Sequence, residues 1–516
     1  MEHALVQVHA LLVDFPSEQQ SLKRALELAR SLDQAAATAQ PPSAADQAAV
    51  QHSLQRLSAL LTPPATFCTD EEDLDAPARL TKEAFRRQAP ALLSLARSLS
   101  ALLPAPDDRP SETDLVLRAQ VVLACGRFVH QDLSGGVSEP EAAASSTSIV
   151  DRLVRQPPHV RLPVLRHLLR TTLPPFFKPH PKLNPATGRV LSRPLGGDRA
   201  MTDWFEDSEE GTTSWRRQAG LASVVKLVIE ALEPAEVEDL WPFLLPPVLT
   251  FLDDYEAQNK LAGVSILDAL LDKADESLLR RTGVGKVFEK SFENAFSALS
   301  DPLSPSLFAA AHPVALKLLN LQHTPSSSSP SSSSSDQPRF DALCTLLTAS
   351  VAHTWEFKAG NVALETVSCA ALAPLIDALG PGSIRYLQLV VPHLCGVLTG
   401  TNGVWSTEVA RMLEAAARAL GAVVRHGRAR MRGRWEGRVV AAVGQCWVEV
   451  REDEAARRLR GASEGGRVAL EELEETLKAV VRELGPSGGL EPSSPSSRIL
   501  GQPALRELFS PAVAAS

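Results

Sequence analysis

The amino-acid sequence predicts an all-α protein, a HEAT/armadillo-like α-solenoid of irregular helical repeats with disordered Ser/Pro-rich linkers. Three observations support this prediction. The 516 residues contain only 5% aromatics and are rich in Ala and Leu, which favours helices packed by aliphatic side chains over a β-sandwich. Between breaker segments rich in Pro, Gly and Ser, apolar residues recur at helical spacing. Helix–turn–helix pairs of about 40 residues also recur, and such units need stacked neighbours to bury their apolar faces.

Changes in composition divide the chain into six predicted regions. Residues 324–337, TPSSSSPSSSSSDQ, offer almost nothing that can pack, so we expect disorder there. The predicted regions are an N-terminal helical region (1–150), an irregular linker-rich segment (151–215), a central HEAT-like core (216–323), the low-complexity linker (324–337), a C-terminal HEAT-like region (338–484) and a flexible tail (485–516).

The clearest helix pair begins with a helix at 240–252, which carries three prolines that remove backbone donors and should bend it. Asp253 and Asp254 then form a turn, where an acidic side chain can cap the next helix. The second helix runs from about Glu256. Gly263 lies in its middle, where glycine costs about 1 kcal/mol relative to alanine, so we expect close approach of a neighbouring helix.

A second pair follows the same plan. Its first helix, at 384–398, contains Pro392, and a turn through Gly400 and Gly403 leads to a second helix at 405–424. A first helix interrupted by proline and a second helix rich in small residues are typical of HEAT repeats. The central and C-terminal regions are therefore expected to share one architecture.

Charge and cysteine content argue against several classes of protein. The formal net charge of -9 is unlike that of a nucleic-acid binder. A mean hydropathy of -0.04 and the lack of an apolar run near ~20 residues argue against a membrane span. The start of the sequence has no basic leader, so we expect no secretory signal. The six cysteines are widely spaced without a CxxC, which indicates free thiols in a reducing compartment. His312, His353 and His393 lack metal-binding spacing, so we expect no metal, no cofactor and no catalytic site.

Two runs of sequence carry a resemblance to a known family. They are FLDDYEAQNKLAGVSILDALL (251–271) and LLRRTGVGKVFEKSFENAF (278–296). The matching residues are Asp253, Asp254, Tyr255, Lys260 and Gly263 in the first run, and Arg281, Thr282, Gly283 and Phe288 in the second. In this order they resemble the core of the Tti-two family. Residues 173–194 and Trp215 resemble the less regular segment that precedes this core, so the resemblance covers roughly 173–303.

The resemblance implies an α-solenoid that is the third subunit of the Triple-T (TTT) complex, together with Tel-two and Tti-one. That assembly works with the Hsp-ninety chaperone and an Rvb-ATPase co-chaperone. It matures phosphatidylinositol-3-kinase-related kinases and so supports DNA-damage and TOR signalling. We therefore expect a non-enzymatic scaffold in the cytoplasm and nucleus that binds Tti-one, Tel-two and client kinases, engages Hsp-ninety indirectly, and binds neither nucleic acid nor membrane. The alternative is another solenoid scaffold, such as a nuclear transport receptor or a phosphatase scaffold.

Two interpretations of the segment around the Asp-Asp turn remain open. In the first, Asp253 and Asp254 form a capped turn, and Lys260 about two turns later holds one repeat against the next. In the second, Tyr255, Asn259 and Lys260 face a protein partner. The candidate structural or partner-binding residues are Asp253, Asp254, Tyr255, Asn259, Lys260, Gly263, Arg281, Thr282 and Gly283.

Two short motifs imitate catalytic sequences. Gly461–Gly465 matches the GxSxG pattern of hydrolases, but the charged run before Ser463 has no strand character, so we expect a loop between helices. Gly283–Lys286 (GVGK) lacks the preceding glycine and the following Ser or Thr of a phosphate-binding loop, so we expect a turn that ends a helix.

Two charged segments admit more than one interpretation. The arginine-rich run 425–438 is expected to be a solvated loop between helices, with an acidic protein partner and then nucleic acid as the alternatives. Ser208, inside an acidic stretch at 207–210, forms a possible phosphorylation motif for a co-chaperone pocket, with a plain solvated loop as the alternative.

Overall fold

Helices make up almost all of the regular structure in the computed structural model. The described residues are 2–13, 19–37, 43–69, 71–103, 111–195, 214–323, 336–357, 360–401, 403–431, 433–484 and 503–513. Their one β feature is an isolated antiparallel bridge between Leu183 and Val190. The all-α solenoid prediction is confirmed. Contacts divide the chain into unit 1, Met1–Lys286, and unit 2, Val287–Ser516.

Unit 1 is a series of helices with one irregular segment. Its helices are α1 (Glu2–Val13), α2 (Gln19–Ala37), α3 (Ala44–Leu60), α4 (Ala76–Ala101), α5 (Glu112–Gly126), α6 (Pro140–Val154), α7 (Pro158–His167), α9 (Leu221–Ala231), α10 (Pro234–Leu252), α11 (Ala257–Leu271) and α12 (Glu276–Thr282). The irregular segment follows α7 with a π turn at Leu168–Thr172 and a 3-10 turn at Pro174–Phe176.

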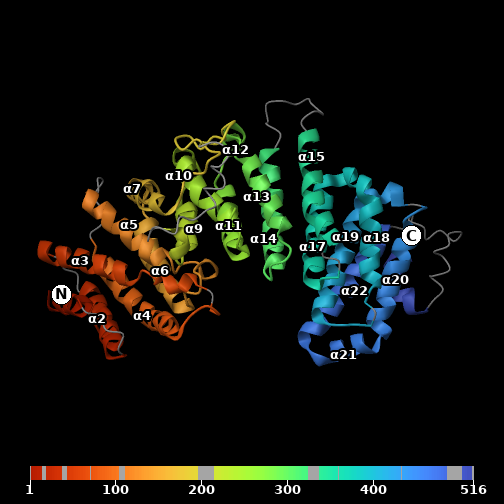
Figure 1. The fold of residues 1–516 in the computed structure, drawn as a ribbon. Coiled ribbons are helices and arrows are strands. Elements are labelled where there is room, and N and C mark those ends of the chain that lie inside the picture. The colour runs from red at the N-terminus through yellow and green to blue at the C-terminus, as the bar shows by residue number, and fades with distance from the viewer. Residues whose placement is uncertain are drawn as a thin grey trace. The chain divides into compact units, whose positions relative to one another are not determined.

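The first hairpins of unit 1 stack in two layers (Figure 1). Helices α1, α3 and α5 pack in one row, and α2, α4 and α6 pack in the other. Helix α9 continues the first row against α5 and also packs on α10 and α11. Each amphipathic helix thus buries its apolar stripe on the next hairpin, as the sequence pattern predicts for a solenoid.

Unit 2 repeats this architecture. Its helices are α13 (Gly285–Ser297, which starts at the unit boundary), α14 (Ser304–Gln322), α15 (Asp336–Leu347), α16 (His353–Phe357), α17 (Val362–Leu379), α18 (Leu387–Thr399), α19 (Thr407–Met431), α20 (Glu436–Glu452), α21 (Glu454–Ala462), α22 (Glu464–Leu484) and α23 (Arg506–Val513). Helices α14, α17, α19 and α22 form one row, and α18 packs on α19 and α20.

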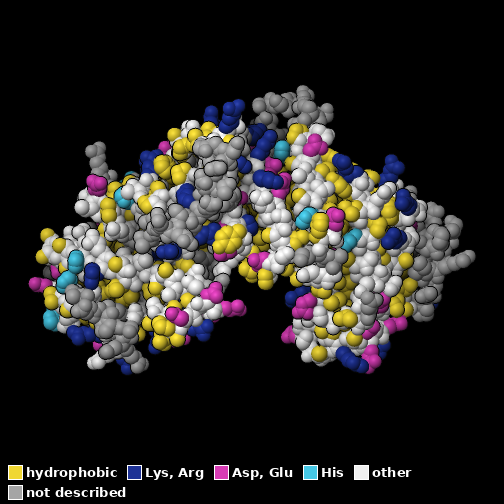
Figure 2. Space-filling view, viewed as in Figure 1, with side chains coloured by type: hydrophobic (Ala, Val, Ile, Leu, Met, Phe, Trp, Pro, Cys, Tyr) yellow, Lys and Arg dark blue, Asp and Glu magenta, His cyan; other side chains and the backbone are white. Residues whose placement is uncertain are grey.

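The surface of each unit is mixed in character. On the face shown in Figure 2, hydrophobic side chains lie scattered among basic and acidic ones. Large apolar side chains are exposed in both units, among them Leu80 and Tyr255 in unit 1 and Phe357 and Val404 in unit 2. Single exposed apolar residues are normal on protein surfaces, so exposure by itself does not mark a binding site.

The predicted helix boundaries shift where capping decides them. Helix α10 begins at Pro234 rather than Leu240, because Pro234 suits the first helical turn and Glu233 and Glu236 form a capping box. Helix α18 begins at Leu387, after a 3-10 turn. Helix α19 runs on to Met431, beyond the predicted end at 424.

The predicted low-complexity linker and tail differ in part from the structure. Most of 324–337 lies outside the described residues, but α15 already begins at Asp336. Within the predicted flexible tail, Pro503–Leu505 forms a 3-10 turn and α23 follows it. Leu508 and Phe509 of α23 are buried, so this part of the tail belongs to the packed structure of unit 2.

Among the described residues, one segment is apolar enough, by length and composition, to cross a membrane. It spans Val362–Thr399, with a mean hydropathy of 1.6, and 56% of its most apolar window is buried. The segment consists of α17 and α18 with a 3-10 turn between them, and α17 packs against α14 and α19. A core helix has the same composition, so the expectation that the chain does not bind membranes stays a prediction.

We predict that Gly263→Ala destabilises unit 1. A Cβ built at Gly263 would lie 2.6 Å from Leu252 Cα and 2.7 Å from the Phe251 carbonyl carbon, where α10 crosses α11. Backbone cannot yield as a side chain can, so we expect a loss of about 1–3 kcal/mol despite the helix propensity of alanine. Denaturant unfolding measures it. Gly396→Ala, at an open helical position in α18, should be neutral or stabilising; equal effects at both sites would contradict the prediction.

A second prediction concerns acid stability. His312 in α14 is buried, and burial lowers its pKa to about 4. Because the folded pKa lies below the unfolded value, the contribution of neutral His312 is present above about pH 6.5 and is lost as pH falls toward 4. Acidification from pH 7 to pH 5 should cost unit 2 about 2 kcal/mol through this residue. Unfolding of His312→Gln should depend less on pH; an unchanged dependence would refute the assignment.

Candidate functional site

The Asp-Asp turn between α10 and α11 contains a fully buried carboxylate. The Asp254 side chain has 0% exposure and forms two hydrogen bonds with the Arg216 guanidinium, at 3.0 and 2.6 Å. Asn259 Nδ2 and the Tyr255 backbone N–H each donate to an Asp254 oxygen at 2.6 Å. Both oxygens of this carboxylate thus accept hydrogen bonds, which is the condition under which a buried charge is tolerated.

The Arg216 guanidinium also lies between two aromatic rings. Its central carbon is 4.6 Å from the Trp215 ring centroid and 4.7 Å from that of Tyr255. Trp215 in turn packs edge-on against Phe251 at 4.9 Å, which ties the end of the irregular segment to α10. Tyr255 remains 75% exposed. The result is a rigid pair of aromatic rings about a cation, with one ring open to solvent.

These residues line a groove of about 320 Å³ on unit 1. Besides Trp215, Arg216 and Tyr255, its wall is mainly polar, with contributions from Cys68, Asp132, Gln218, Glu256, Gln258 and Asn259. Cys68 is exposed, although partial desolvation raises the pKa of its thiol. A hydrogen bond to the neighbouring Glu256 carboxylate raises the pKa of the Tyr255 hydroxyl, so Tyr255 offers a neutral O–H.

A buried arginine beside the groove holds its α9 wall in place. Arg127, just after α5, donates to the Ala219 carbonyl at 2.6 Å and to Gln218 Oε1 at 2.7 Å. Burial lowers the pKa of Arg127 to about 10, so it stays charged at neutral pH. Gly220 has a φ of 75°, and a Cβ there would lie 2.7 Å from the Arg127 carbonyl oxygen. Only glycine fits this turn.

The structure divides the predicted partner-facing set. Tyr255 is exposed, whereas Asn259 turns toward Asp254 and Lys260 is buried. Burial lowers the pKa of Lys260, while the Asp253 and Asp254 carboxylates act in the opposite direction. Lys260 therefore belongs to the interior, and its role in holding one repeat against the next stays a prediction. The N-cap residue of α11 is Glu256, whose side chain makes no capping hydrogen bond, and the Asp254 carboxylate binds Arg216, Asn259 and the Tyr255 amide.

Arg281, Thr282 and Gly283 lie at the end of α12 and do not line the groove. The Thr282 carbonyl accepts a hydrogen bond from Val190 N–H at 2.9 Å, and Arg281 forms an ion pair with Glu238 of α10. Gly283 takes the left-handed position, with a φ of 72°, that ends the helix. Thr282 thus ties the irregular segment to α12, and Arg281 ties α12 to α10.

The motifs that imitate active sites have structural roles. Ser463 lies between α21 and α22, where its Oγ accepts from Gly466 N–H at 3.0 Å, so it caps a helix.

The arginine-rich run is helical up to Met431, and the prediction of a loop is wrong there. Arg425 binds Asp377 and Glu483, and Arg428 also binds Glu483, so these two cations are paired inside unit 2.

The remaining expectations concern phosphorylation and metal binding. Ser208 lies outside the described residues. Within the part of the chain that the structure describes, no three His, Cys, Asp or Glu side chains gather as a metal would require. His393 stacks on Trp355 at 3.8 Å and lies 2.5 Å from Glu365, which is a packed pair in unit 2.

Comparison with known proteins decides the family. A model of the Tti2 family matches residues 121–404, more than half of the chain. The chain belongs to the Tti2 family. The matched span extends beyond 173–303, on which the sequence resemblance rests, and includes all of the groove except Phe67, Cys68 and Thr69. Membership indicates a Tti2-type role in a protein assembly and a scaffold type of protein rather than an enzyme.

Solved structures and curated proteins add little to this assignment. A crystal structure of a Kap121p mutant is 13% identical, with a TM-score of 0.41, over 94% of this chain and 46% of that chain. Importin beta in a polyethylene glycol condition is 13% identical, with a TM-score of 0.39, over 98% of this chain and 62% of that chain. The Tti2 chain thus spans about half the length of the Kap121p structure it matches. TM-scores this low do not indicate a role in nuclear transport. No curated protein matches the chain.

Sequence reasoning missed Arg216 as a site residue. It lies 38 positions before Asp254, in a stretch without regular spacing, so no periodic pattern connects the two. One signal was available, since a carboxylate in an otherwise apolar helix junction needs a cation, and a Trp-Arg-Arg triplet precedes the core.

We predict that breaking this ion pair destabilises unit 1. Asp254→Ala leaves Arg216 and Asn259 without their shared acceptor, and we expect a loss of about 3 kcal/mol. Arg216→Met should cost a similar amount, and the double variant should cost less than the sum because the two residues act together. Unfolding in urea measures all three. The control is Arg217→Met at the exposed neighbouring position; an equal loss there, or strict additivity, would disprove the coupling.

Proposed function

We propose that this Tti2-family chain is the Tti-two subunit of a Triple-T assembly. It binds Tti-one and Tel-two, and through them supports the maturation of phosphatidylinositol-3-kinase-related kinases by the Hsp-ninety system in the cytoplasm and nucleus. Support comes from family membership over 121–404 and from the solenoid fold. The observation that carries the proposal is the exposed Tyr255 ring against Arg216, two residues of the groove that both lie within the matched span.

The groove has the composition of a protein-binding site. Tyrosine, tryptophan and arginine are the residues that most often dominate interface energetics, and here Trp215, Arg216 and Tyr255 adjoin. Arg216 is already held by Asp254, so its order is established before any partner arrives. Preorganisation of this kind lowers the entropy cost of association. A partner would cover the Tyr255 ring and hydrogen-bond with the polar wall.

The proposed mechanism is assembly without chemistry. The solenoid presents preformed helical surfaces to its sister subunits, and energy for client maturation comes from the chaperone ATPases. Stacked helices suit this task because each repeat contacts only its neighbours and leaves long faces uncovered. On this proposal the chain needs no bound metal or cofactor.

We predict that Tyr255→Ser reduces assembly without unfolding the chain. A hot-spot tyrosine contributes about 2 kcal/mol, so the affinity for Tti-one and Tel-two should fall roughly 30-fold. Less Tti-one and Tel-two should then be recovered with the tagged chain. Affinity purification with quantitative mass spectrometry measures it, and levels of the client kinases should fall in parallel. The matched control is Leu80→Ser in α4, another exposed apolar residue of unit 1.

Two outcomes would count against the proposal. Failure of the unaltered chain to recover Tti-one and Tel-two would refute the assembly itself. Recovery by Tyr255→Ser equal to that of Leu80→Ser would refute the groove as the contact while leaving the family role intact.

A further inference from the structure

The last described helix of unit 2 occupies a site built by other helices. The 3-10 turn Pro503–Leu505 packs on α20, and α23 packs on α22. Leu505 of the turn is buried, as are Leu508 and Phe509 of α23. The Trp447 indole Nε1 donates to the Ala504 carbonyl at 3.0 Å. A Cβ built at Gly444 would lie 3.7 Å from Leu505 Cδ2, an ordinary van der Waals distance, so Leu505 packs directly over this part of α20.

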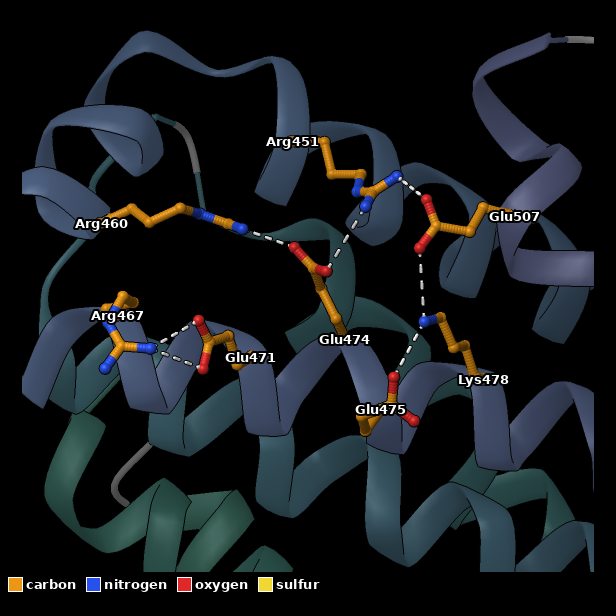
Figure 3. Close-up of polar contacts among 8 residues, drawn as sticks. All are labelled: Arg451, Arg460, Arg467, Glu471, Glu474, Glu475, Lys478 and Glu507. Atoms are coloured by element: carbon orange, nitrogen blue, oxygen red, sulfur yellow. Dashed lines mark hydrogen bonds and ion pairs between the residues drawn. The ribbon is translucent and has the colours of Figure 1, made fainter.

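Two cations recognise the acidic residue of α23. Figure 3 shows Glu507 between Arg451 of α20 and Lys478 of α22, with Lys478 Nζ at 3.4 Å. Both cations also lie over the Trp447 ring, at 4.6 Å for Arg451 and 5.5 Å for Lys478. The surface under α23 therefore combines a tryptophan, an arginine and a lysine, a composition suited to an acidic amphipathic ligand.

The side chains and helices of this surface have partners other than α23. Arg451 and Arg460 both pair with Glu474 of α22, which is nearly buried (Figure 3). Lys478 has a second partner in Glu475 at 2.8 Å. Helix α22 packs on α19, α20 and α21, so its position does not depend on α23.

Helix α23 is held mainly by the apolar contacts of Leu508 and Phe509, and little by its own helical stability or its ion pairs. It has eight residues, and an isolated helix of that length is not stable in water. Its ion pairs involve Arg451 and Glu507, whose side chains are 36% and 51% exposed, and exposed pairs contribute little. Residues 485–502 stand between α22 and α23 in the sequence, so α23 reaches this surface as a segment of the same chain.

We propose that the α20–α22 surface around Trp447 is a binding site for a short amphipathic helix of a partner protein, and that α23 is its displaceable occupant within the chain. The partner helix would carry the pattern seen in 505–509: an aliphatic anchor, then a carboxylate directly before two adjacent apolar anchors. The carboxylate binds Arg451 and Lys478, and the apolar anchors pack against the surface that Leu508 and Phe509 now cover. This proposal does not depend on the groove of unit 1, nor on which protein binds that groove.

A labelled peptide of residues 503–513 tests the site on the whole chain. With Leu508→Ser and Phe509→Ser in the chain, its own α23 no longer competes, and fluorescence anisotropy should show saturable binding. The unaltered chain should bind the peptide at least about tenfold more weakly, because a tethered competitor acts at roughly millimolar effective concentration. A peptide with Glu507→Lys should lose most of this affinity, and one of scrambled order should not bind. Equal binding to both chains, or none to either, overturns the proposal.

Hydrogen exchange on the unaltered chain provides a second test that needs no variant. Amides of α23 should exchange at least about a hundredfold faster than those in the middle of α22, because release of α23 leaves the rest of unit 2 folded. Equal protection of the two helices would make α23 an integral part of the core. Loss of cooperative unfolding in the double variant would lead to the same conclusion and would overturn the proposal.

Discussion

The buried pair of Asp254 and Arg216 is the interaction on which the arrangement of unit 1 depends. A carboxylate at 0% exposure is tolerated only with its oxygens occupied, and Arg216, Asn259 and the Tyr255 amide supply the donors. The same contact holds Trp215 against Phe251 and holds the end of the irregular segment on the α10–α11 hairpin. It also sets the Tyr255 ring at the surface, so one buried charge supports both the fold and the candidate site.

Around this pair, the solenoid is stabilised by apolar burial between neighbouring hairpins. Rows of alternate helices pack in each unit, and each helix offers a second face to solvent or to a partner. Membership of the Tti2 family and the solenoid fold agree on a scaffold type of protein. Several of its polar side chains, Ser463 and Arg425 among them, serve caps and ion pairs within their own unit.

Local chemistry made several elements predictable. The breaker residues Asp253 and Asp254 separate two apolar helical patterns, and α10 and α11 follow on either side of them. Gly263 indicated a close helix crossing, and the α10 backbone lies against it. Gly283 indicated a left-handed helix end and adopts one. Each of these features is encoded within a few residues, through periodicity or through the backbone freedom of glycine.

Partners distant in the chain could not be predicted in this way. The sequence by itself determined the helical class, the α10–α11 hairpin and the family, because these depend on spacing and on ordered short motifs. Only the tertiary structure decided that Asp254 binds Arg216, that Lys260 is buried while Tyr255 is exposed, and that residues 503–513 pack on α20 and α22. The physical reason is that ion pairing and burial depend on which helix surfaces come into contact when the hairpins stack. The order of residues along the chain does not specify those contacts.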